Sequence, residues 1–448
     1  MAISIRSGYH ATVMKSQKVL VISENMCRDS LIPFPLGPAW IAAAVERAGH
    51  EVMGLDLMFS DDPAGECARA VEEFNPDCIG LSIRNIDNQD VENTEFYVDD
   101  AVPLIAAMKQ VTEAPIVPGG AGYSIYPTQC LEYLGLGYGV VGEGEVTFPA
   151  LLECLAAGGD PRKVPGVATW LDGVASPDAP GVRPDLGSLP QPDRRTFDVT
   201  RYDWNPESGP PFFVPNVQSR RGCARSCIYC STPDIEGSRV RVRPVEAVAD
   251  EMESMQREFG LNLAIINDSL FNVPEEYALD LCREFIGRGL EIRWSTGLDP
   301  SASDELLEAM ARAGCTNLSM GNESGCDHIL MRLRKGFGVA DVERAVRTAR
   351  SAGMKVNCFL LLGGPGETRE TIDESVELLD RLQPEMVNVS PGVRIYPNTE
   401  LAAIAVEEGV VSPEDDLLLP RFYVSPAVRD WLFDYTREII AARPGWEQ

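Results

Sequence analysis

The stretch NVQSRRGCARSCIYC (216–230) decides how this chain is interpreted. Its first residues predict a short strand, and it ends in three closely spaced cysteines, Cys223, Cys227 and Cys230. Cysteine thiolates hold iron–sulfur clusters, and a cubic four-iron cluster normally takes four of them. Three thiolates leave one iron open to a substrate or a cofactor. The stretch therefore predicts a catalytic 4Fe-4S cluster on a loop that follows a strand.

Two other interpretations of the three cysteines stay open. A structural zinc ion would need a fourth Cys or His ligand, and the three histidines, His10, His50 and His328, are all distant in sequence. The cysteines could also be buried residues without a ligand, as most of the other nine in the chain are predicted to be. Their spacing on one loop favours the cluster.

From residue 216 to 400, apolar strand-like runs alternate with amphipathic helical segments. The predicted strands cover residues 216–220, 261–267, 291–296, 316–321, 355–363 and 385–390. Six such units predict a partial (β/α)6 TIM barrel, three quarters of the eight-unit form. Residues 401–448 are predicted to form a mostly helical tail.

The N-terminal part of the chain, residues 1–157, has the same alternation. Its predicted strands cover residues 18–23, 51–57, 78–83, 115–120 and 138–144. The pattern predicts an α/β fold with a doubly wound, Rossmann-like parallel sheet, whose ligands bind beyond the carboxyl ends of the strands. Residues 158–215 hold eleven of the 33 prolines and predict a Pro-rich linker, with a short hairpin near residues 164–173.

The composition excludes some classes of partner. The 448 residues include 39 Lys and Arg against 68 Asp and Glu, a formal charge of −29, of which −15 falls in residues 1–160. Such a surface repels phosphate, so nucleic acid and anionic membranes are not expected as partners, whereas a cationic small-molecule substrate would be attracted. No apolar stretch approaches the length of a membrane span, and the first residues do not resemble a signal peptide. We expect a cytoplasmic protein.

The pattern CxxxCxxC after the first strand of a parallel barrel resembles the radical S-adenosylmethionine (SAM) superfamily. The resemblance implies that Cys223, Cys227 and Cys230 hold the 4Fe-4S cluster. It also implies that the open iron binds SAM, which one electron splits into methionine and a 5'-deoxyadenosyl radical. Tyr229 occupies the aromatic position before the last cysteine, which packs beside the cluster in that family. A plain core aromatic is an equal alternative for Tyr229.

Later segments also resemble the superfamily. Asn267 and Asp268 end the second predicted strand, where many relatives carry an acidic pair at the SAM site, although Asn267 departs from that pair. The segment Gly321-Asn322-Glu323-Ser324-Gly325, followed by Lys335-Gly336, resembles the fourth-strand segment, which implies that Glu323 and Ser324 lie near SAM.

The turn Gly363-Gly364-Pro365-Gly366-Glu367-Thr368 matches the family's turn after the fifth strand, and its glycines let backbone approach a cofactor. For Glu367 and Thr368, a turn and helix cap is the favoured interpretation. Ser295 completes the predicted cofactor-binding set. Glu323 and Asp268 are also the candidates for acid–base catalysis. Pocket-shaping roles are predicted for five strand-end residues: Trp294, Ser295, Asn357, Arg394 and Tyr396.

The first domain resembles the cobalamin-binding domain of one large radical SAM subgroup. The matching features are Pro38, the loop at Arg84, Gly119-Gly120 and the segment 142–145. The family signature that supplies a lower axial histidine is missing, so the sequence leaves cobalamin in doubt. Glu143 and Glu145 could simply provide favourable charge at the start of the next helix.

Two enzymatic hypotheses and one non-enzymatic hypothesis follow from the resemblance. Without cobalamin, the radical would start the dehydration of a 1,2-diol in an aminosugar, as in the dehydratase of apramycin biosynthesis. The missing histidine, the short C-terminus and the acidity, which suits a cationic secondary-metabolite substrate, favour that hypothesis slightly. With cobalamin, the reaction would be methylation of an unactivated carbon. A non-catalytic cluster or corrinoid sensor is the third hypothesis.

Six arginines surround the cysteines between residues 220 and 243, against two acidic residues. The alternation in RVRVR (239–243) predicts that three of them share one face of a strand. Such a face could dock an acidic electron donor such as flavodoxin, or it could protect an exposed edge strand from aggregation.

Overall fold

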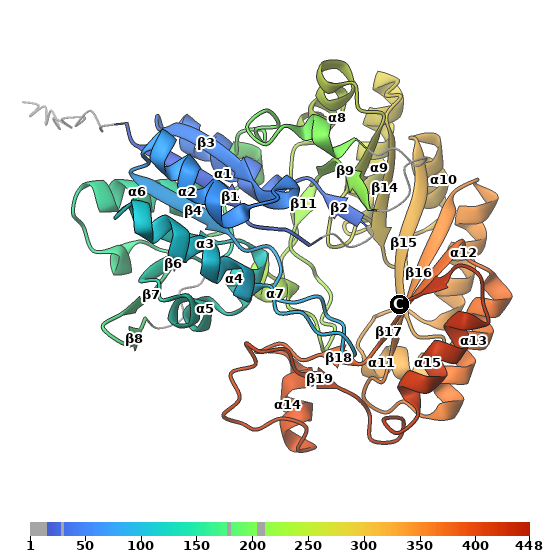
Figure 1. The fold of residues 1–448 in the computed structure, drawn as a ribbon. Helices are drawn as coiled ribbons and strands as arrows, with labels where there is room; N and C mark the ends of the chain where they lie inside the picture. The colour runs from blue at the N-terminus through green and yellow to red at the C-terminus, as the bar shows by residue number, and fades with distance from the viewer. Residues whose placement is uncertain (1–15, 28–30, 177–180, 204–210) are drawn as a thin grey trace, which may run out of the picture.

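The computed structural model describes residues 16–27, 31–176, 181–203 and 211–448. The chain folds into two α/β units that lie side by side (Figure 1). The predicted fold class, a doubly wound parallel sheet followed by a partial barrel, is confirmed. The division of the chain at residues 157, 215 and 400 stays a prediction. Among the described residues, no helix is long and apolar enough to cross a bilayer.

The N-terminal unit contains a four-stranded parallel sheet. Its strands, in the spatial order β3-β1-β4-β5, are β3 (Glu51–Asp56), β1 (Lys18–Ser23), β4 (Cys78–Ser82) and β5 (Ile116–Gly119). Five of the six β1 residues are buried, as expected for a sheet covered on both faces. The helices of the unit are α1 (Leu36–Arg47), α2 (Pro63–Phe74), α3 (Val98–Val111), α4 (Ala121–Ile125), α5 (Pro127–Leu134) and α6 (Gly144–Ala156).

The proline-rich segment contributes strands to the N-terminal unit. β7 (Val167–Leu171) pairs antiparallel with β6 (Tyr138–Val140) and forms the expected hairpin with β8 (Val174–Ala175). Farther along, β9 (Phe212–Val214) pairs with β2 (Leu31–Pro33). The segment is therefore packed against the first domain along much of its described length.

The C-terminal unit is a curved, seven-stranded parallel sheet. Its strands, in spatial order, are β10 (Asn216–Val217), β13 (Leu263–Ile266), β14 (Arg293–Leu298), β15 (Cys315–Glu323), β16 (Lys355–Leu362), β17 (Met386–Pro391) and β20 (Trp446–Glu447). Buried and half-buried residues alternate along β16 and β17, because one face packs on helices and the other lines the barrel interior. The helices on the outer face are α8 (Val245–Phe259), α9 (Glu275–Arg288), α10 (Asp304–Arg312), α12 (Val339–Ser351), α13 (Arg369–Leu382) and α15 (Leu432–Ala441).

The C-terminal tail is more than helical. α14 (Glu400–Glu407) and α15 fit the expectation, but β19 (Phe422–Tyr423) pairs with β18 (Val393–Arg394), and β20 adds a strand beside β17. The chain end thus closes one edge of the barrel sheet, the edge farthest from β10 (Figure 1).

Candidate functional site

Cys223, Cys227 and Cys230 lie on a loop between β11 (Arg220–Arg221) and α7 (Thr232–Ile235), and all three are half-buried. Burial raises the pKa of Cys223 and Cys227. Among the described residues, no three His, Cys, Asp or Glu side chains converge as a single metal ion requires. In a cubic cluster each thiolate binds a different iron, so its ligands stand farther apart.

The loop begins at Gly222, which has a positive φ of 89°. A Cβ at this position would come within 2.3 Å of the carbonyl oxygen of Arg239, so the turn requires glycine. The next residue, Cys223, donates its N–H to the carbonyl of Gly237 over 3.1 Å. The close approach of these two segments fixes where the first cysteine stands.

Tyr229, Glu323 and Lys335 meet beside the cysteine loop. The ammonium of Lys335 donates to the Tyr229 hydroxyl and to Oε1 of Glu323, both over 3.1 Å. Burial raises the pKa of Tyr229, and the Glu323 carboxylate raises it further. Burial alone would lower the pKa of Lys335, but the charges of Glu323 and the Cys227 thiol reverse this and raise it. The structure thus brings two residues of the predicted SAM site together, with a lysine between them.

Glu323 ends β15 in an unusual backbone conformation. Its φ is 59°, and the pairing of β15 with β16 shifts register between Met320 and Glu323. A non-glycine residue with positive φ is strained, and such strain is concentrated at functional sites. This agrees with a binding role for Glu323, while its contact with SAM stays a prediction.

Asp268 lies two residues beyond the end of β13 and is bound by the segment that follows β10. Its carboxylate accepts hydrogen bonds from the backbone of Ser219 (2.7 Å), from the Ser219 hydroxyl and from the guanidinium of Arg220 (3.1 Å). Both side chains of the Asp268–Arg220 ion pair are almost fully buried. These contacts give Asp268 a structural role just before the cysteine loop, while its acid–base and SAM-binding roles stay predictions.

Two other predicted SAM-site residues make contacts outside the group formed by Tyr229, Lys335 and Glu323. Ser324 is fully buried and its hydroxyl is 3.2 Å from that of Ser375. Asn267 is exposed and lines a cavity between the two domains. Ser295 is half-buried on β14, where alternation places it on the interior face of the barrel.

The glycine turn after β16 is organised around a buried carboxylate. Glu367 accepts the backbone N–H groups of Gly363 and Gly364 (2.9 Å to the latter). Burial raises the pKa of Glu367 to about 8. Thr368 accepts a hydrogen bond from the backbone of Thr371 and caps α13. The capping role favoured for Thr368 is confirmed, and the two glycine N–H groups are occupied within the turn.

Among the predicted pocket residues, Trp294 and Arg394 have structural roles. Trp294 is completely buried and donates its indole N–H to the carbonyl of Ala313, so it faces the helices. Arg394 forms a buried ion pair with Asp87 of the first domain over 2.7 Å, and its guanidinium lies 4.9 Å from the Tyr396 ring. The pocket-shaping expectation is therefore wrong for Trp294 and Arg394. Ser295 and Asn357 remain half-buried on the interior face.

A cavity of about 290 Å³ lies where the carboxyl ends of β1, β4 and β5 face the barrel. One wall consists of the glycine-rich ends of the strands and the start of α1, and the opposite wall includes Asn216, Gln218 and Arg221. Gly120 has a φ of 99°, and a Cβ there would lie 2.5 Å from the carbonyl oxygen of Ile83. In the first turn of α1, Gly37 has open space where a side chain would be. This glycine cradle at the end of a doubly wound sheet fits a flat cofactor such as a corrin.

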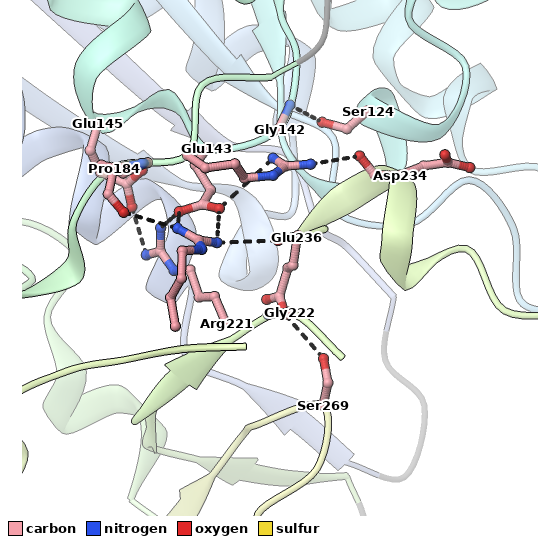
Figure 2. A network of polar contacts seen from close by, with 12 residues as sticks. Ser124, Gly142, Glu143, Glu145, Pro184, Arg221, Gly222, Asp234, Glu236 and Ser269 are labelled. Atoms are coloured by element: carbon pink, nitrogen blue, oxygen red, sulfur yellow. Dashed lines mark hydrogen bonds and ion pairs between the residues drawn. The ribbon is translucent and has the colours of Figure 1, made fainter. Parts of the chain in front are cut away.

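A buried ionic network joins this cavity to the cysteine loop (Figure 2). Glu143, at the N-cap of α6, binds Arg221 over 2.8 Å and also binds Arg241. Glu145 binds the other end of Arg221 over 2.6 Å. The prediction that these glutamates only supply charge to the α6 terminus is therefore incomplete, because they also bridge the two domains. Glu236 extends the network by accepting the N–H of Gly222.

Ion pairs also involve most of the six arginines between residues 220 and 243. Arg243 binds Glu251 and Arg225 binds Asp299, so that five of the six arginines are paired within the protein. Arg239 is exposed. The three arginines of RVRVR therefore do not form one free face, because strand β12 covers only Arg241–Val242 and the side chains are drawn to separate carboxylates. Docking of an acidic electron donor stays a prediction.

Comparison with known proteins agrees with these two sites. Residues 217–379 match the Radical SAM superfamily, and residues 30–152 match the B12 binding domain. The chain therefore contains a Radical SAM region preceded by a B12 binding domain. The cysteine loop, Tyr229, Glu323 and Lys335 all lie in the region that matches the Radical SAM superfamily. Most residues that line the cavity lie in the region that matches the B12 binding domain.

Several similar proteins are methyltransferases. This chain is 28% identical to tryptophan 2-C-methyltransferase of Streptomyces laurentii over 88% of its own length and 76% of that protein. It is 27% identical to cytidylyl-2-hydroxyethylphosphonate methyltransferase of Streptomyces wedmorensis, over 90% and 84% of the two chains. The structure of the methyltransferase TsrM from Kitasatospora setae, with cobalamin and a [4Fe-4S] cluster bound, has a TM-score of 0.84. The superposition covers 97% of this chain and 93% of the TsrM chain at 23% sequence identity, which shows a likeness of fold.

These comparisons correct the preference for a cobalamin-free dehydratase. The named relatives are methyltransferases, and the first domain matches a B12 binding domain. The missing axial histidine therefore does not exclude a B12 binding domain. Glycines, apolar residues, several polar residues and the Glu143–Arg221 network line the cavity between the domains, and neither of the two histidines in the described part of the chain, His50 and His328, is among them.

Proposed function

We propose that this protein is a cobalamin-dependent radical SAM C-methyltransferase that acts on a small polar substrate. The observation that carries the proposal is the position of the interdomain cavity. The cavity opens at the carboxyl ends of the strands of the B12-binding domain. It faces β10, the first barrel strand, which precedes the cysteine loop. A corrin in this cavity would lie between the first domain and the reacting end of the barrel.

When bound, the cluster and SAM supply radical chemistry, and the corrinoid supplies the methyl group that is transferred. The three cysteines of the loop would hold the cluster. The cradle at Gly37 and Gly120 would admit the corrin. A side chain at position 37 would project into the open space of the cavity, and a side chain at position 120 would displace the backbone of Ile83. Ser295 and Asn357 on the barrel interior present hydroxyl and amide groups, which can orient a polar substrate by hydrogen bonds.

The two enzymatic hypotheses differ in what remains of SAM. Donation of the SAM methyl group to a corrinoid leaves S-adenosylhomocysteine, whereas a cobalamin-free radical dehydratase leaves only methionine and 5'-deoxyadenosine. The experiment is anaerobic reconstitution of the cluster, with or without hydroxocobalamin, followed by incubation with SAM and a reductant. The products are separated by chromatography, and retained corrinoid is measured from its visible absorbance after gel filtration.

We expect about one corrinoid per chain and S-adenosylhomocysteine only in the corrinoid-loaded sample. Formation of 5'-deoxyadenosine by a protein that retains no corrinoid would overturn the proposal in favour of the cobalamin-free reaction. Retention of corrinoid without any turnover of SAM would favour a sensor.

A further inference from the structure

Two opposite charges stand next to the cysteine loop and are partly withdrawn from water. The side chains of Lys335 and Glu323 are only 10% and 16% exposed, and their charged atoms are 3.1 Å apart. The ammonium also lies 5.6 Å from the centre of the Tyr229 ring, and Tyr229 directly precedes the cysteine Cys230. A charge in such a position is poorly screened and acts on its neighbours over several ångströms.

The segment that carries the lysine is attached to the cysteine loop. The N–H of Ile228 donates to the carbonyl of Leu333 over 3.3 Å, and both side chains belong to a small apolar cluster with Ile329 and Cys326. Because Ile228 lies between the second and third cysteines, Lys335 keeps its place relative to those two residues.

We propose that Lys335 and Glu323 are positioning residues that set the reduction potential of the cluster held by the three cysteines. In the reduction step one electron from an external donor enters the cluster, and no bond is made or broken. The reduced cluster carries one more negative charge than the oxidised one. A nearby ammonium stabilises that charge and a nearby carboxylate opposes it, and charge and hydrogen bonding around a cluster are known means of tuning its potential.

The proposal makes opposite predictions for the two residues. Lys335→Met removes the positive charge with little change of volume and should shift the midpoint potential to a more negative value. Glu323→Gln removes the negative charge and should shift it to a less negative value. Lys335→Arg keeps the charge and should stay near the wild-type potential.

The chain offers a matched control one residue away. Arg334 is also cationic, but its side chain is 55% exposed and paired with Glu400 on the surface. Arg334→Met removes the same charge where solvent screens it, so the potential should not change.

The measurement is an anaerobic redox titration of the reconstituted full-length protein, with dithionite as reductant and the reduced cluster quantified by electron paramagnetic resonance. Corrinoid is left out of the samples, so the result does not depend on the methyltransferase proposal. Potentials that do not move in Lys335→Met, or that move in the same direction in Lys335→Met and Glu323→Gln, would overturn the proposal. If Lys335→Met fails to retain iron, Glu323→Gln alone decides: a less negative potential supports the proposal and an unchanged one overturns it.

Discussion

The guanidinium of Arg221 donates a 2.8 Å hydrogen bond to the carboxylate of Glu143, from the base of the cysteine loop to the wall of the interdomain cavity. Both side chains are less than a tenth exposed. Since Arg241 and Arg183 also approach Glu143, this carboxylate balances positive charge brought from more than one segment. It connects the two cofactor sites inferred for this protein.

Removal of the Glu143 carboxylate should be costly. Glu143→Ala leaves Arg221 and Arg241 with less compensation in a buried position, and breaking a buried ion pair by removing one partner typically costs about 3–5 kcal/mol. Chemical denaturation measures the loss in the free energy of unfolding. As a control, Glu308→Ala breaks the exposed ion pair with Arg312 within α10 and should leave that free energy almost unchanged. Equal effects of the two substitutions would contradict the importance of the network.

Filling the cavity from α1 should block corrinoid binding. Gly37→Leu introduces a side chain in the exposed first turn of α1, where nothing lies within 4 Å of the added Cβ. The fold should therefore be kept, while the affinity for hydroxocobalamin, measured by absorbance titration, falls at least tenfold. The matched control is Gly287→Leu in α9, which is equally open but remote from the cavity. Unchanged affinity in Gly37→Leu would place the corrin elsewhere.

The loss of a cluster ligand should differ from the loss of a buried cysteine nearby. Cys227→Ala should abolish cluster retention and the release of 5'-deoxyadenosine, because a thiolate ligand is removed. Cys326, packed against Ile228, is buried and has no predicted ligand role, so Cys326→Ala should keep both. Iron analysis and chromatography of the products check the pair. Iron retention at the wild-type level in Cys227→Ala would be incompatible with the assigned ligand set.

Glu367 should make stability dependent on pH in the neutral range. Burial raises its pKa to about 8 in the folded protein, whereas an unfolded glutamate titrates near pH 4.3. Between these values the folded state binds the extra proton, so the contribution of Glu367 to stability is complete below about pH 4 and is lost as the pH rises towards 8.

The Glu367→Gln variant should remove this dependence, because the amide oxygen can still accept from Gly363 and Gly364 but does not titrate. Relative to wild type, the variant should therefore gain stability as the pH rises, by up to about 1.4 kcal/mol per pH unit. Denaturation curves between pH 5 and 8 test the effect. Parallel profiles of the two proteins would show that Glu367 does not titrate in this range.

Much of the fold and part of the site follow from short-range patterns. The spacing of Cys223, Cys227 and Cys230 points to a cluster, since all its ligands lie on one loop. The alternation and helical periodicity predict most strands and helices close to their observed bounds, such as residues 18–23 for β1. The cap at Thr368 is likewise a local signal, because a helix terminus is satisfied by residues three positions apart.

Other assignments needed the tertiary structure. Asp268 stands at a strand end, as a site residue would, but only the structure shows that its carboxylate is paired with Arg220. Lys335 appears in the sequence only as part of a Lys-Gly pair, and its place beside Tyr229 depends on the packing of α11 (Asp327–Arg332) against the cysteine loop. The segment 220–243 has an excess of arginines, and Glu143 and Glu145 are two acidic residues close together in the first domain. Together they were a signal for ion pairs between the domains, which the sequence analysis did not use.

By itself, then, the sequence determined the order of the α/β units and the cluster-binding loop, because periodicity and spacing act between residues a few positions apart. Only the tertiary structure decided which charges neutralise one another and which glycines line a cavity. Arg221 and Glu143 are 78 positions apart in the chain, and many carboxylates could in principle meet that guanidinium. The choice among them is made by burial, which leaves a charge stable only where the packed domains bring its partner within hydrogen-bond distance.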